Sequence, residues 1–320
     1  MNIKNSNILV TGGAGFIGSH LTDRLVAEGA HRIVVVDDLS LGREENLSAA
    51  RAAMSGLEFI PMDLADDTAL IRLRGLGKFD FCFHLAVIPL PASLVQPKWV
   101  MDRNVMMTST IMELAREGGI QRTVVFSSSE VYGTARSVPM PEEHPLEAET
   151  PYAASKVASD SLVVAYHRTF GVDVVLQRPF NNFGPRQNSR AYAGIIPIVI
   201  ERARGGLPIE IHGDGLQTRD FIYVEDTVRA AVALAQRPEL IGEVFNVARG
   251  QETTILELVQ TLLRIMGKDA VGVIHAAPRP GDVRRHLAGV DKAHKAFGFT
   301  PSTGLQEGLE RTVAWYLGQS

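Results

Sequence analysis

One short segment near the N-terminus constrains the fold of this chain more than any other. A β-branched run at 8–11 leads into the sequence GGAGFIG at 12–18, and a stretch with helical periodicity follows at 16–28. Gly12, Gly15 and Gly18 lack a Cβ atom, so the backbone between a strand and a helix can turn tightly and approach a bound group. The first turn of that helix would offer free N–H groups to a pyrophosphate. An ordinary tight loop is the competing interpretation of such a spacing.

The segments that follow repeat the alternation of strand and helix. Apolar runs typical of strands that are covered on both faces occur at 32–37, 57–61, 79–85, 122–127 and 172–177. Between them, the segments 43–54, 66–74, 100–118 and 152–170 have helical periodicity. We therefore predict an α/β fold, a Rossmann-type doubly wound parallel sheet with a smaller C-terminal substrate domain.

A change in composition after Arg178 predicts the boundary between the two domains. Loops rich in glycine, proline and asparagine appear at 178–187 and 212–217, whereas 226–237 and 244–247 again have the patterns of a helix and a strand of the sheet. We assign residues 1–178 and about 216–249 to the dinucleotide-binding domain. The substrate domain then comprises about 179–215 and 250–320.

An acidic residue at the end of the second predicted strand indicates which dinucleotide is bound. Asp37 follows Gly18 by 19 residues. A carboxylate at this place accepts hydrogen bonds from the ribose hydroxyls and repels a 2′-phosphate, which favours NAD over NADP. Asp38 is a second candidate, although a solvated loop acid is its simpler interpretation. Asp63, after the third predicted strand, would either meet the adenine amino group or cap the next helix.

A second group of residues predicts acid–base chemistry. Tyr152 and Lys156 are four residues apart and share one face of a predicted helix. Lys156 and a cationic nicotinamide would lower the pKa of the Tyr152 phenol, which could then act as a general base for an alcohol. The sequence FSSSEVYG at 126–133 brings hydroxyl groups to the carboxyl end of the fifth strand, where the same crevice is expected. There, the Glu130 carboxylate could remove a proton or bind a hydroxyl group of the substrate.

The composition argues against several other classes of function. The net charge is −4 without a basic stripe, so nucleic acid is not an expected partner. No apolar run approaches the roughly 20 residues that span a bilayer, and the N-terminal run is too short for a signal peptide. The single cysteine, Cys82, is expected to be a buried inert thiol, and a cytoplasmic location is the default. No metal site is predicted, and packing roles are expected for His20 and His84.

These motifs together resemble those of the extended short-chain dehydrogenases/reductases, in the group of NAD-dependent nucleotide-sugar epimerases and dehydratases. The resemblance extends over essentially the whole chain. It is carried by TGGAGFIGSH at 11–20, VVDDLS at 35–40, FSSSEVYG at 126–133, PYAASK at 151–156, RPFNNFGPRQ at 178–187, GDGLQTRDFIYVEDT at 213–227 and RPGDVRR at 279–285.

The resemblance implies a role for each matching residue. Tyr152 is the implied catalytic base, Lys156 its partner and Ser128 the hydroxyl that holds the reacting oxygen, with Glu130 beside them. The implied cofactor contacts are Gly12, Gly15, Phe16, Ile17, Gly18, Asp37, Asp38, Asp63, Leu64, Leu85, Ala86, Asn104, Tyr152 and Lys156. The implied contacts with a nucleotide-sugar, most simply a UDP-sugar, are Ser128, Ser129, Asn181, Asn182, Arg219 and Arg279, the arginines holding the pyrophosphate. A homodimer through 100–118 and 152–170 is also implied.

Smaller differences predict the particular reaction. The runs TRDFIYVEDT and RPGDVRR are similar to those of UDP-hexose 4-epimerases, so a 4-epimerase with a transient 4-keto intermediate is predicted. Ser129 stands where the 4,6-dehydratases of the group carry an aspartate, yet a dehydratase or a UDP-glucuronate-type decarboxylase that uses Glu130 at C5 stays open. A net reductase and a non-catalytic NAD-sensing protein are further alternatives. The apolar loop at 86–93 departs from the more polar loop of the epimerases and leaves the sugar open.

Overall fold

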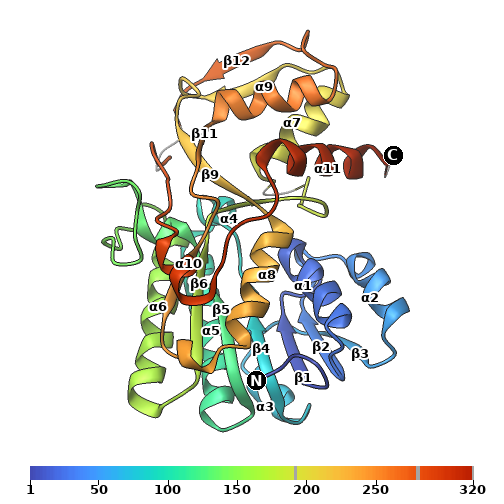
Figure 1. Cartoon of the computed structure of the whole chain (residues 1–320), viewed down its shortest axis with the longest axis vertical. Helices are drawn as coiled ribbons and strands as arrows, with labels where there is room; N and C mark the ends of the chain where they lie inside the picture. The colour runs from blue at the N-terminus through green and yellow to red at the C-terminus, as the bar shows by residue number, and fades with distance from the viewer. Residues whose placement is uncertain (191–192, 279–281, 319–320) are drawn as a thin grey trace.

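A parallel sheet of seven strands forms the centre of the molecule (Figure 1). The computed structural model describes residues 1–190, 193–278 and 282–318. The strand order is β10-β6-β5-β4-β1-β2-β3, so the winding reverses at β1, next to β4, which places a crevice at the carboxyl ends of these strands. The predicted doubly wound α/β fold is confirmed. The strands are β1 (Asn7–Thr11), β2 (Arg32–Asp37), β3 (Leu57–Pro61), β4 (Phe79–His84), β5 (Ile120–Phe126), β6 (Val174–Pro179) and β10 (Val244–Val247).

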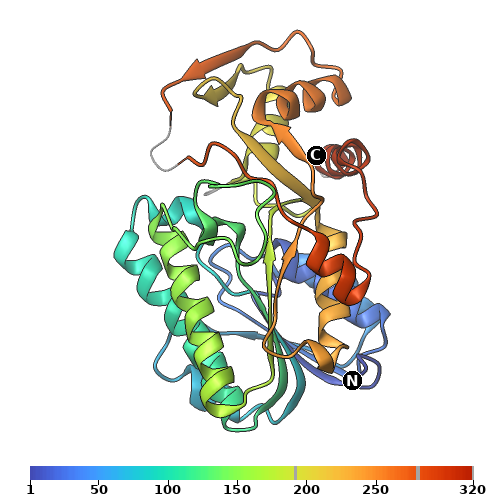
Figure 2. The same cartoon turned by 60° about the vertical axis from the view of Figure 1, so that its left-hand side comes forward.

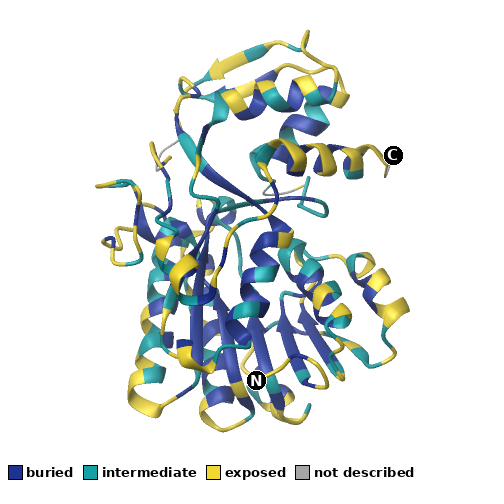
Figure 3. Cartoon of the chain, in the orientation of Figure 1, coloured by how far each residue is buried: buried dark blue, intermediate teal, exposed yellow. Residues whose placement is uncertain are grey.

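Helices cover both faces of this sheet (Figure 2). One face packs against α1 (Phe16–Ala27) and α8 (Val224–Ala235), and the other against α3 (Ala69–Arg74), α5 (Pro97–Arg116) and α6 (Pro151–Phe170). Successive strand residues point to opposite faces: Ile8 and Val10 belong to the first apolar cluster, and Leu9 belongs to the second. Because both faces are covered, the apolar residues of the inner strands are buried, whereas those of the edge strand β3 are only partly buried (Figure 3).

A smaller part with its own apolar core lies beyond the carboxyl ends of the central strands (Figure 1). It contains a three-stranded sheet in the order β11-β9-β7 and the parallel pair β12-β8. Its core joins Ile200, Leu258 and Val313 from three different helices. The elements are β7 (Asn181–Phe183), α7 (Ile195–Arg204), β8 (Ile209–His212), β9 (Thr218–Tyr223), β11 (Glu252–Thr254), α9 (Ile255–Ile265), β12 (Val273–Ala276) and α11 (Leu305–Gly318).

Helix α10 (Asp291–Phe297) bears on where the two domains divide. The predicted boundaries place it in the substrate domain, together with the rest of 250–320. In the structure, however, the Phe297 ring centroid lies 5.3 Å from that of Phe245 on β10, and Phe299 joins the same apolar cluster of the large sheet. We therefore propose that α10 belongs to the dinucleotide-binding domain. Strand β9, whose Phe221 and Tyr223 belong to the core of the smaller part, is assigned to the substrate domain, and the other boundaries are kept as predicted.

Several predicted elements begin or end elsewhere in the structure. The helix predicted at 43–54 is a 3-10 turn, η1 (Glu44–Leu47), followed by α2 (Ser48–Ala53). The helix predicted at 66–74 starts only at Ala69, because the Asp66 carboxylate closes a turn by accepting the Thr68 backbone N–H at 2.8 Å. The strand predicted at 172–177 is shifted to 174–179, since Gly171 ends α6 in the left-handed conformation (φ 70°).

Candidate active site

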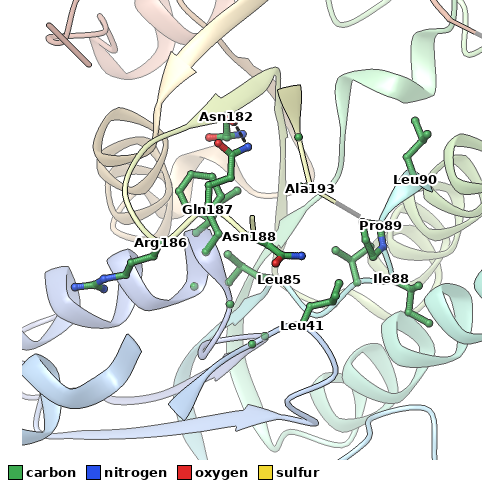
Figure 4. A pocket seen from close by; sticks show the side chains of 18 of the residues that line it. Leu41, Leu85, Ile88, Pro89, Leu90, Asn182, Arg186, Gln187, Asn188 and Ala193 are labelled. Atoms are coloured by element: carbon green, nitrogen blue, oxygen red, sulfur yellow. Dashed lines mark hydrogen bonds between the residues drawn. The ribbon is translucent and has the colours of Figure 1, made fainter. Parts of the chain in front are cut away.

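A cleft of about 830 Å³ lies between the carboxyl ends of the central strands and the smaller part of the molecule. Residues that follow β1, β2, β4, β5 and β6 line one side of it, and residues of α7 and α11 line the other. Figure 4 looks into the cleft, with Asn182, Gln187 and Asn188 on one side and Ile88 and Pro89 on the other. The cleft therefore occupies the place that the reversal of strand order predicts for a ligand.

The glycine-rich turn after β1 forms one end of the cleft. Gly12 has a φ of 69°, and a Cβ atom on it would lie 2.7 Å from the backbone nitrogen of Ala86. A Cβ atom on Gly18 would lie 2.2 Å from the carbonyl oxygen of Gly12. Helix α1 begins after Gly15 without a side-chain cap or an acidic residue in its first turn, so its N–H groups suit a pyrophosphate. Gly12, Gly15, Phe16, Ile17, Gly18, Leu64, Leu85 and Ala86 all line the cleft, which is the arrangement that NAD requires.

Asp37 lies at the edge of the cleft at the end of β2, and only 8% of it is exposed. Its carboxylate accepts hydrogen bonds from the backbone N–H groups of Ala14, at 3.0 Å, and Leu39, at 2.9 Å. Burial raises the pKa of Asp37, while these hydrogen bonds act in the opposite direction. The neighbouring Asp38 also lines the cleft but is exposed, and its carboxylate accepts only from Ser40 N within the loop. Asp37 is therefore the better placed of the two acids to select the ribose.

We expect Asp37→Asn to weaken NAD binding by roughly tenfold and to raise the ratio of NADP to NAD affinity. The change removes the negative charge, and a hydrogen bond to a charged group contributes about 1.5–3 kcal/mol. Titration calorimetry on cofactor-stripped protein measures both affinities. Asp38→Asn is the matched control, since it removes an adjacent but exposed carboxylate. Equal effects of the two substitutions would contradict the assignment.

Two predicted cofactor contacts do not line the cleft. Asp63 forms an ion pair with Arg103 of α5, and its carboxylate accepts the Ala65 backbone N–H at 2.9 Å. It caps no helix either, because α3 begins later, after Thr68. The cap interpretation of Asp63 is therefore wrong, whereas its contact with the adenine amino group stays a prediction.

Asn104 is the second predicted contact that does not line the cleft, and it acts on the loop that follows β4. Its side chain is 3% exposed. The side-chain Oδ1 of Asn104 accepts the Ile88 backbone N–H at 2.8 Å. Its Nδ2 donates to the Ile88 carbonyl oxygen at 3.1 Å and to Ser155 Oγ at 3.0 Å. Asn104 thus fixes the wall of the cleft to helix α6, and its contact with the cofactor stays a prediction.

Tyr152 lies on the first turn of α6, where Thr150 caps the helix by accepting the Ala153 N–H at 3.1 Å. The phenol is hydrogen-bonded to the Ser128 side chain, and both residues line the cleft. Burial raises the pKa of Tyr152 to about 12, the hydrogen bond with Ser128 lowers it, and the charge of Glu130 raises it further. Burial is therefore the largest effect, and the lowering expected from Lys156 together with a bound cationic nicotinamide stays a prediction.

Lys156 is nearly fully buried, one helical turn beyond Tyr152. Its ammonium group donates a hydrogen bond to the Phe126 carbonyl oxygen at 2.6 Å, at the end of β5. Burial lowers the pKa of Lys156 to about 8, although the charge of Asp160 raises it. The lysine is thus anchored to the central sheet, one helical turn from Tyr152. Its ammonium group loses a proton at lower pH than the ammonium group of an exposed lysine does.

Glu130 lies on η2 (Ser129–Tyr132) and lines the cleft together with Ser128, Ser129 and Arg219. The Ser128 hydroxyl oxygen accepts the Glu130 backbone N–H at 3.2 Å, which fixes the start of this turn. Burial raises the pKa of Glu130, the Arg219 cation lowers it, and Asp282 raises it. A carboxyl group with a raised pKa holds its proton to higher pH than an exposed glutamate does, which suits a general acid or base.

The residues predicted to contact the nucleotide differ in whether their polar atoms already have hydrogen-bond partners in the protein. Arg219 donates to the Val283 carbonyl at 2.6 Å and to Asp282 at 2.5 Å, which orients its guanidinium in the cleft. The side-chain oxygen of Asn181 is buried and has no hydrogen-bond partner within the described residues. Both polar atoms of the Asn182 amide, in contrast, bind Phe180 O and Thr227 Oγ1. Arg279 lies outside the described residues.

The sequence interpretation did not name several polar residues of the cleft, Asp282 among them, and from the apolar loop after β4 it named only Leu85 and Ala86 as cofactor contacts. Asp282 lines the cleft and pairs with Arg219, and its only sequence signal is its place within RPGDVRR. Seven consecutive apolar residues, 85–91, also line the cleft, and all are partly exposed there. Of these, Leu85, Ile88, Pro89 and Leu90 are labelled in Figure 4.

The predicted packing roles of the histidines and the cysteine agree with the structure. His84 is buried and lies between the hydroxyls of Thr11 and Thr108, at 2.8 and 3.2 Å. His20 is hydrogen-bonded to the Pro185 carbonyl, and Cys82 is buried with a raised pKa because of burial. Within 1–190, 193–278 and 282–318, no three side chains are grouped as metal ligands would be. No helix of the same ranges has the length and apolar character needed to cross a membrane.

The fold, the dinucleotide cradle and the tyrosine–serine–lysine group define a class, and comparison with known proteins identifies it. Residues 8–248 match the NAD dependent epimerase/dehydratase family. A UDP-glucose 4-epimerase from Mycolicibacterium smegmatis is 38% identical, covering 98% of this chain and 99% of the relative. A dTDP-glucose 4,6-dehydratase from an Actinoplanes species is 35% identical, covering 97% of each. The chain belongs to the NAD-dependent epimerase/dehydratase family, whose members are enzymes.

Solved structures lead to the same family. A UDP-glucose 4-epimerase from Thermotoga maritima, in complex with UDP-glucose, aligns with a TM-score of 0.91 and 33% identity, over 98% of this chain and 99% of that one. A dTDP-glucose 4,6-dehydratase from Streptomyces venezuelae, with NAD bound, aligns with a TM-score of 0.92 and 34% identity, over 98% and 97%. NAD is therefore the cofactor of this chain, in agreement with the glycine turn and Asp37.

Proposed function

We propose that this enzyme is a nucleotide-sugar 4-epimerase, with a UDP-sugar as substrate and a transient 4-keto sugar as intermediate. The observation that carries the proposal is the hydrogen-bonded pair of Tyr152 and Ser128 in the cleft, followed by a serine at position 129. An enzyme that eliminates water uses a further acid to expel the leaving hydroxyl, and Ser129 has no carboxyl group. The relatives named for UDP-glucose 4-epimerase activity support the same choice.

The side chains of the cleft suit a reversible oxidation at C4. Tyr152 takes the proton of the C4 hydroxyl, and the Ser128 hydroxyl holds the oxygen in place. NAD, when bound, supplies the chemistry of accepting a hydride from C4 and returning it. Tyr152 then returns its proton to the 4-keto oxygen as the alcohol forms again, with the opposite configuration at C4. The positive charge of Lys156 stabilises the phenolate during these steps.

The diphosphate of the substrate is assigned to the side of the cleft that carries Arg219 and Asn181. The guanidinium offers a planar set of donors to phosphate oxygens, and Arg279 is the predicted second cation. The predicted homodimer through α5 and α6 remains a proposal. Its support is that α5 exposes 43% of Trp99 and 45% of Met106.

Glu130 favours a second candidate reaction at C5. Burial raises the pKa of this carboxyl, and it lies in the same cleft as Tyr152. A group in that state can deliver or remove a proton beside a 4-keto sugar, as a dehydratase or a uronic-acid decarboxylase requires. The similarity to relatives named as dTDP-glucose 4,6-dehydratases also supports this second candidate.

The products formed from a panel of UDP-, dTDP- and GDP-sugars test the proposal. We expect a new sugar of unchanged mass, with inverted configuration at C4 by NMR, and no net consumption of added NADH. Loss of water or carbon dioxide would replace the epimerase with the reaction at C5, and Glu130→Gln should then abolish it. Stoichiometric oxidation of NADH would instead indicate a reductase. The absence of any turnover across the panel would contradict all three.

A further inference from the structure

Helix α6 carries a third charged residue on the face that holds Tyr152 and Lys156. Asp160 is one turn beyond Lys156 and two turns beyond Tyr152, so the three side chains share one side of the helix. Asp160 is only 3% exposed, whereas aspartate side chains are seldom buried to this extent unless they are paired. A buried carboxylate at this position needs a cation nearby.

Arg178 of β6 supplies one cation, and it is held rigidly. Its guanidinium donates to one Asp160 oxygen from Nε at 3.1 Å, and its Nη2 lies 3.0 Å from the same oxygen. Its Nη1 donates to Tyr132 Oη at 3.0 Å and to the Glu142 carbonyl at 3.2 Å. Tyr132 in turn donates to Asn246 at 2.7 Å. The arginine is therefore tied to three neighbours and cannot follow a moving carboxylate.

The second oxygen of Asp160 is the unusual feature. It is buried, and the described residues provide no hydrogen-bond partner for it. The nearby charge on the same helix is Lys156, whose ammonium group donates a hydrogen bond to the Phe126 carbonyl oxygen. The two buried residues interact through their charges, since Asp160 raises the pKa of Lys156 against the effect of burial.

We propose that Asp160, fixed by Arg178, is a positioning residue of the active site that keeps the ammonium group of Lys156 charged beside Tyr152. Buried charges persist only when they are paired, and the order of charges along the site is Arg178 positive, Asp160 negative, Lys156 positive. Removal of Asp160 leaves Lys156 as a buried cation without a carboxylate. The inference rests on the proposed role of Lys156 as the partner of Tyr152.

The other groups that face Lys156 decide the direction of the pH effect. Tyr152 is on its own helix, Glu130 follows β5 and acts on Tyr152, and Arg178 lies on β6 behind Asp160. On β4, burial and the charge of Lys156 lower the pKa of His84 to about 3, so this histidine is neutral at working pH. Asp160 is therefore the carboxylate that holds the Lys156 proton, and its loss should make Lys156 lose that proton at lower pH.

The test measures Lys156 directly, in the NAD-bound full chain carrying isotope-labelled lysine. Lys156 is assigned by the loss of its NMR signal in Lys156→Met. Asp160→Asn is expected to lower the titration midpoint of Lys156 by about one pH unit or more, and Arg178→Gln to raise it, because the competing cation is gone. Asp160→Glu should restore the midpoint. Asp173→Asn is the matched control: it breaks a carboxylate pair with the buried Arg122 at the opposite end of β5 and β6.

Turnover gives a second, separate readout. In Asp160→Asn, kcat/KM should fall about tenfold at pH 8 and recover toward the native value near pH 6, whereas a merely structural defect lowers it equally at every pH. Unchanged midpoints in both variants, or shifts in the same direction, would overturn the inference. If one variant fails to fold, the sign of the shift in the other decides. A shifted NMR midpoint without any nucleotide-sugar turnover would support the charge coupling and refute the proposed function.

Discussion

Replacement of Tyr152 by phenylalanine is expected to lower turnover of the nucleotide-sugar by roughly a thousandfold while NAD stays bound. The substitution removes one hydroxyl, and with it the hydrogen bond to Ser128 and the proposed acceptor of the C4 proton. General acid–base catalysis contributes roughly 10²–10⁴-fold to a rate. The ring itself is retained, so the packing at the start of α6 should change little.

The measurement combines product formation with the NAD content of the purified protein. Tyr166→Phe is the matched control, because Tyr166 lies on the same helix but does not line the cleft, and its hydroxyl donates to the partly exposed Glu113 at 3.1 Å. We expect that control to keep its rate within about twofold, as surface substitutions usually have small effects. Native turnover in Tyr152→Phe would refute the mechanism for an epimerase and for a reaction at C5 alike.

The same tyrosine shows what a sequence can predict and what it cannot. The spacing of Tyr152 and Lys156, the glycine turn and Asp37 are local patterns, and the structure brings all of them to one cleft. The strands were predictable for a similar reason, because a sheet that is covered on both faces requires continuous apolar runs, and the run at 244–247 is β10 without any shift. Burial is the largest influence on the pKa of Tyr152, and the sequence did not predict it, since the extent of burial depends on residues distant in sequence.

Side-chain partners across the fold account for the other differences. Asn104 and Asp63 occupy the positions that the resemblance implies, yet Asn104 binds Ile88 and Ser155, and Asp63 pairs with Arg103. No local sequence pattern predicts such contacts. Asp160 and Arg178 are likewise on a helix and a strand, and only the packing of α6 against the sheet reveals that they meet. A sequence motif therefore locates a residue near the site, whereas the fold decides what its side chain touches.

Gly18→Ala is expected to weaken NAD binding by about 10- to 100-fold, and turnover should fall with the loss of cofactor. The added Cβ atom would lie 2.2 Å from the Gly12 carbonyl oxygen and 2.7 Å from the Gly13 Cα, and these backbone atoms cannot rotate away as a side chain can. Helix α1 must then move off the glycine turn, and the N–H groups at its start leave the pyrophosphate position. Overpacking of this kind costs about 1–3 kcal/mol.

Cofactor content after purification and calorimetric affinity for added NAD measure the effect, and circular dichroism reports whether the variant is folded. Gly304→Ala is the matched control: a Cβ atom there meets nothing within 4 Å, and Gly304 has no positive φ. Retention of NAD by folded Gly18→Ala would refute the assignment of the pyrophosphate to the start of α1. Excess NAD should restore turnover in Gly18→Ala but not in Tyr152→Phe, because the first variant lacks the cofactor and the second lacks the proton acceptor.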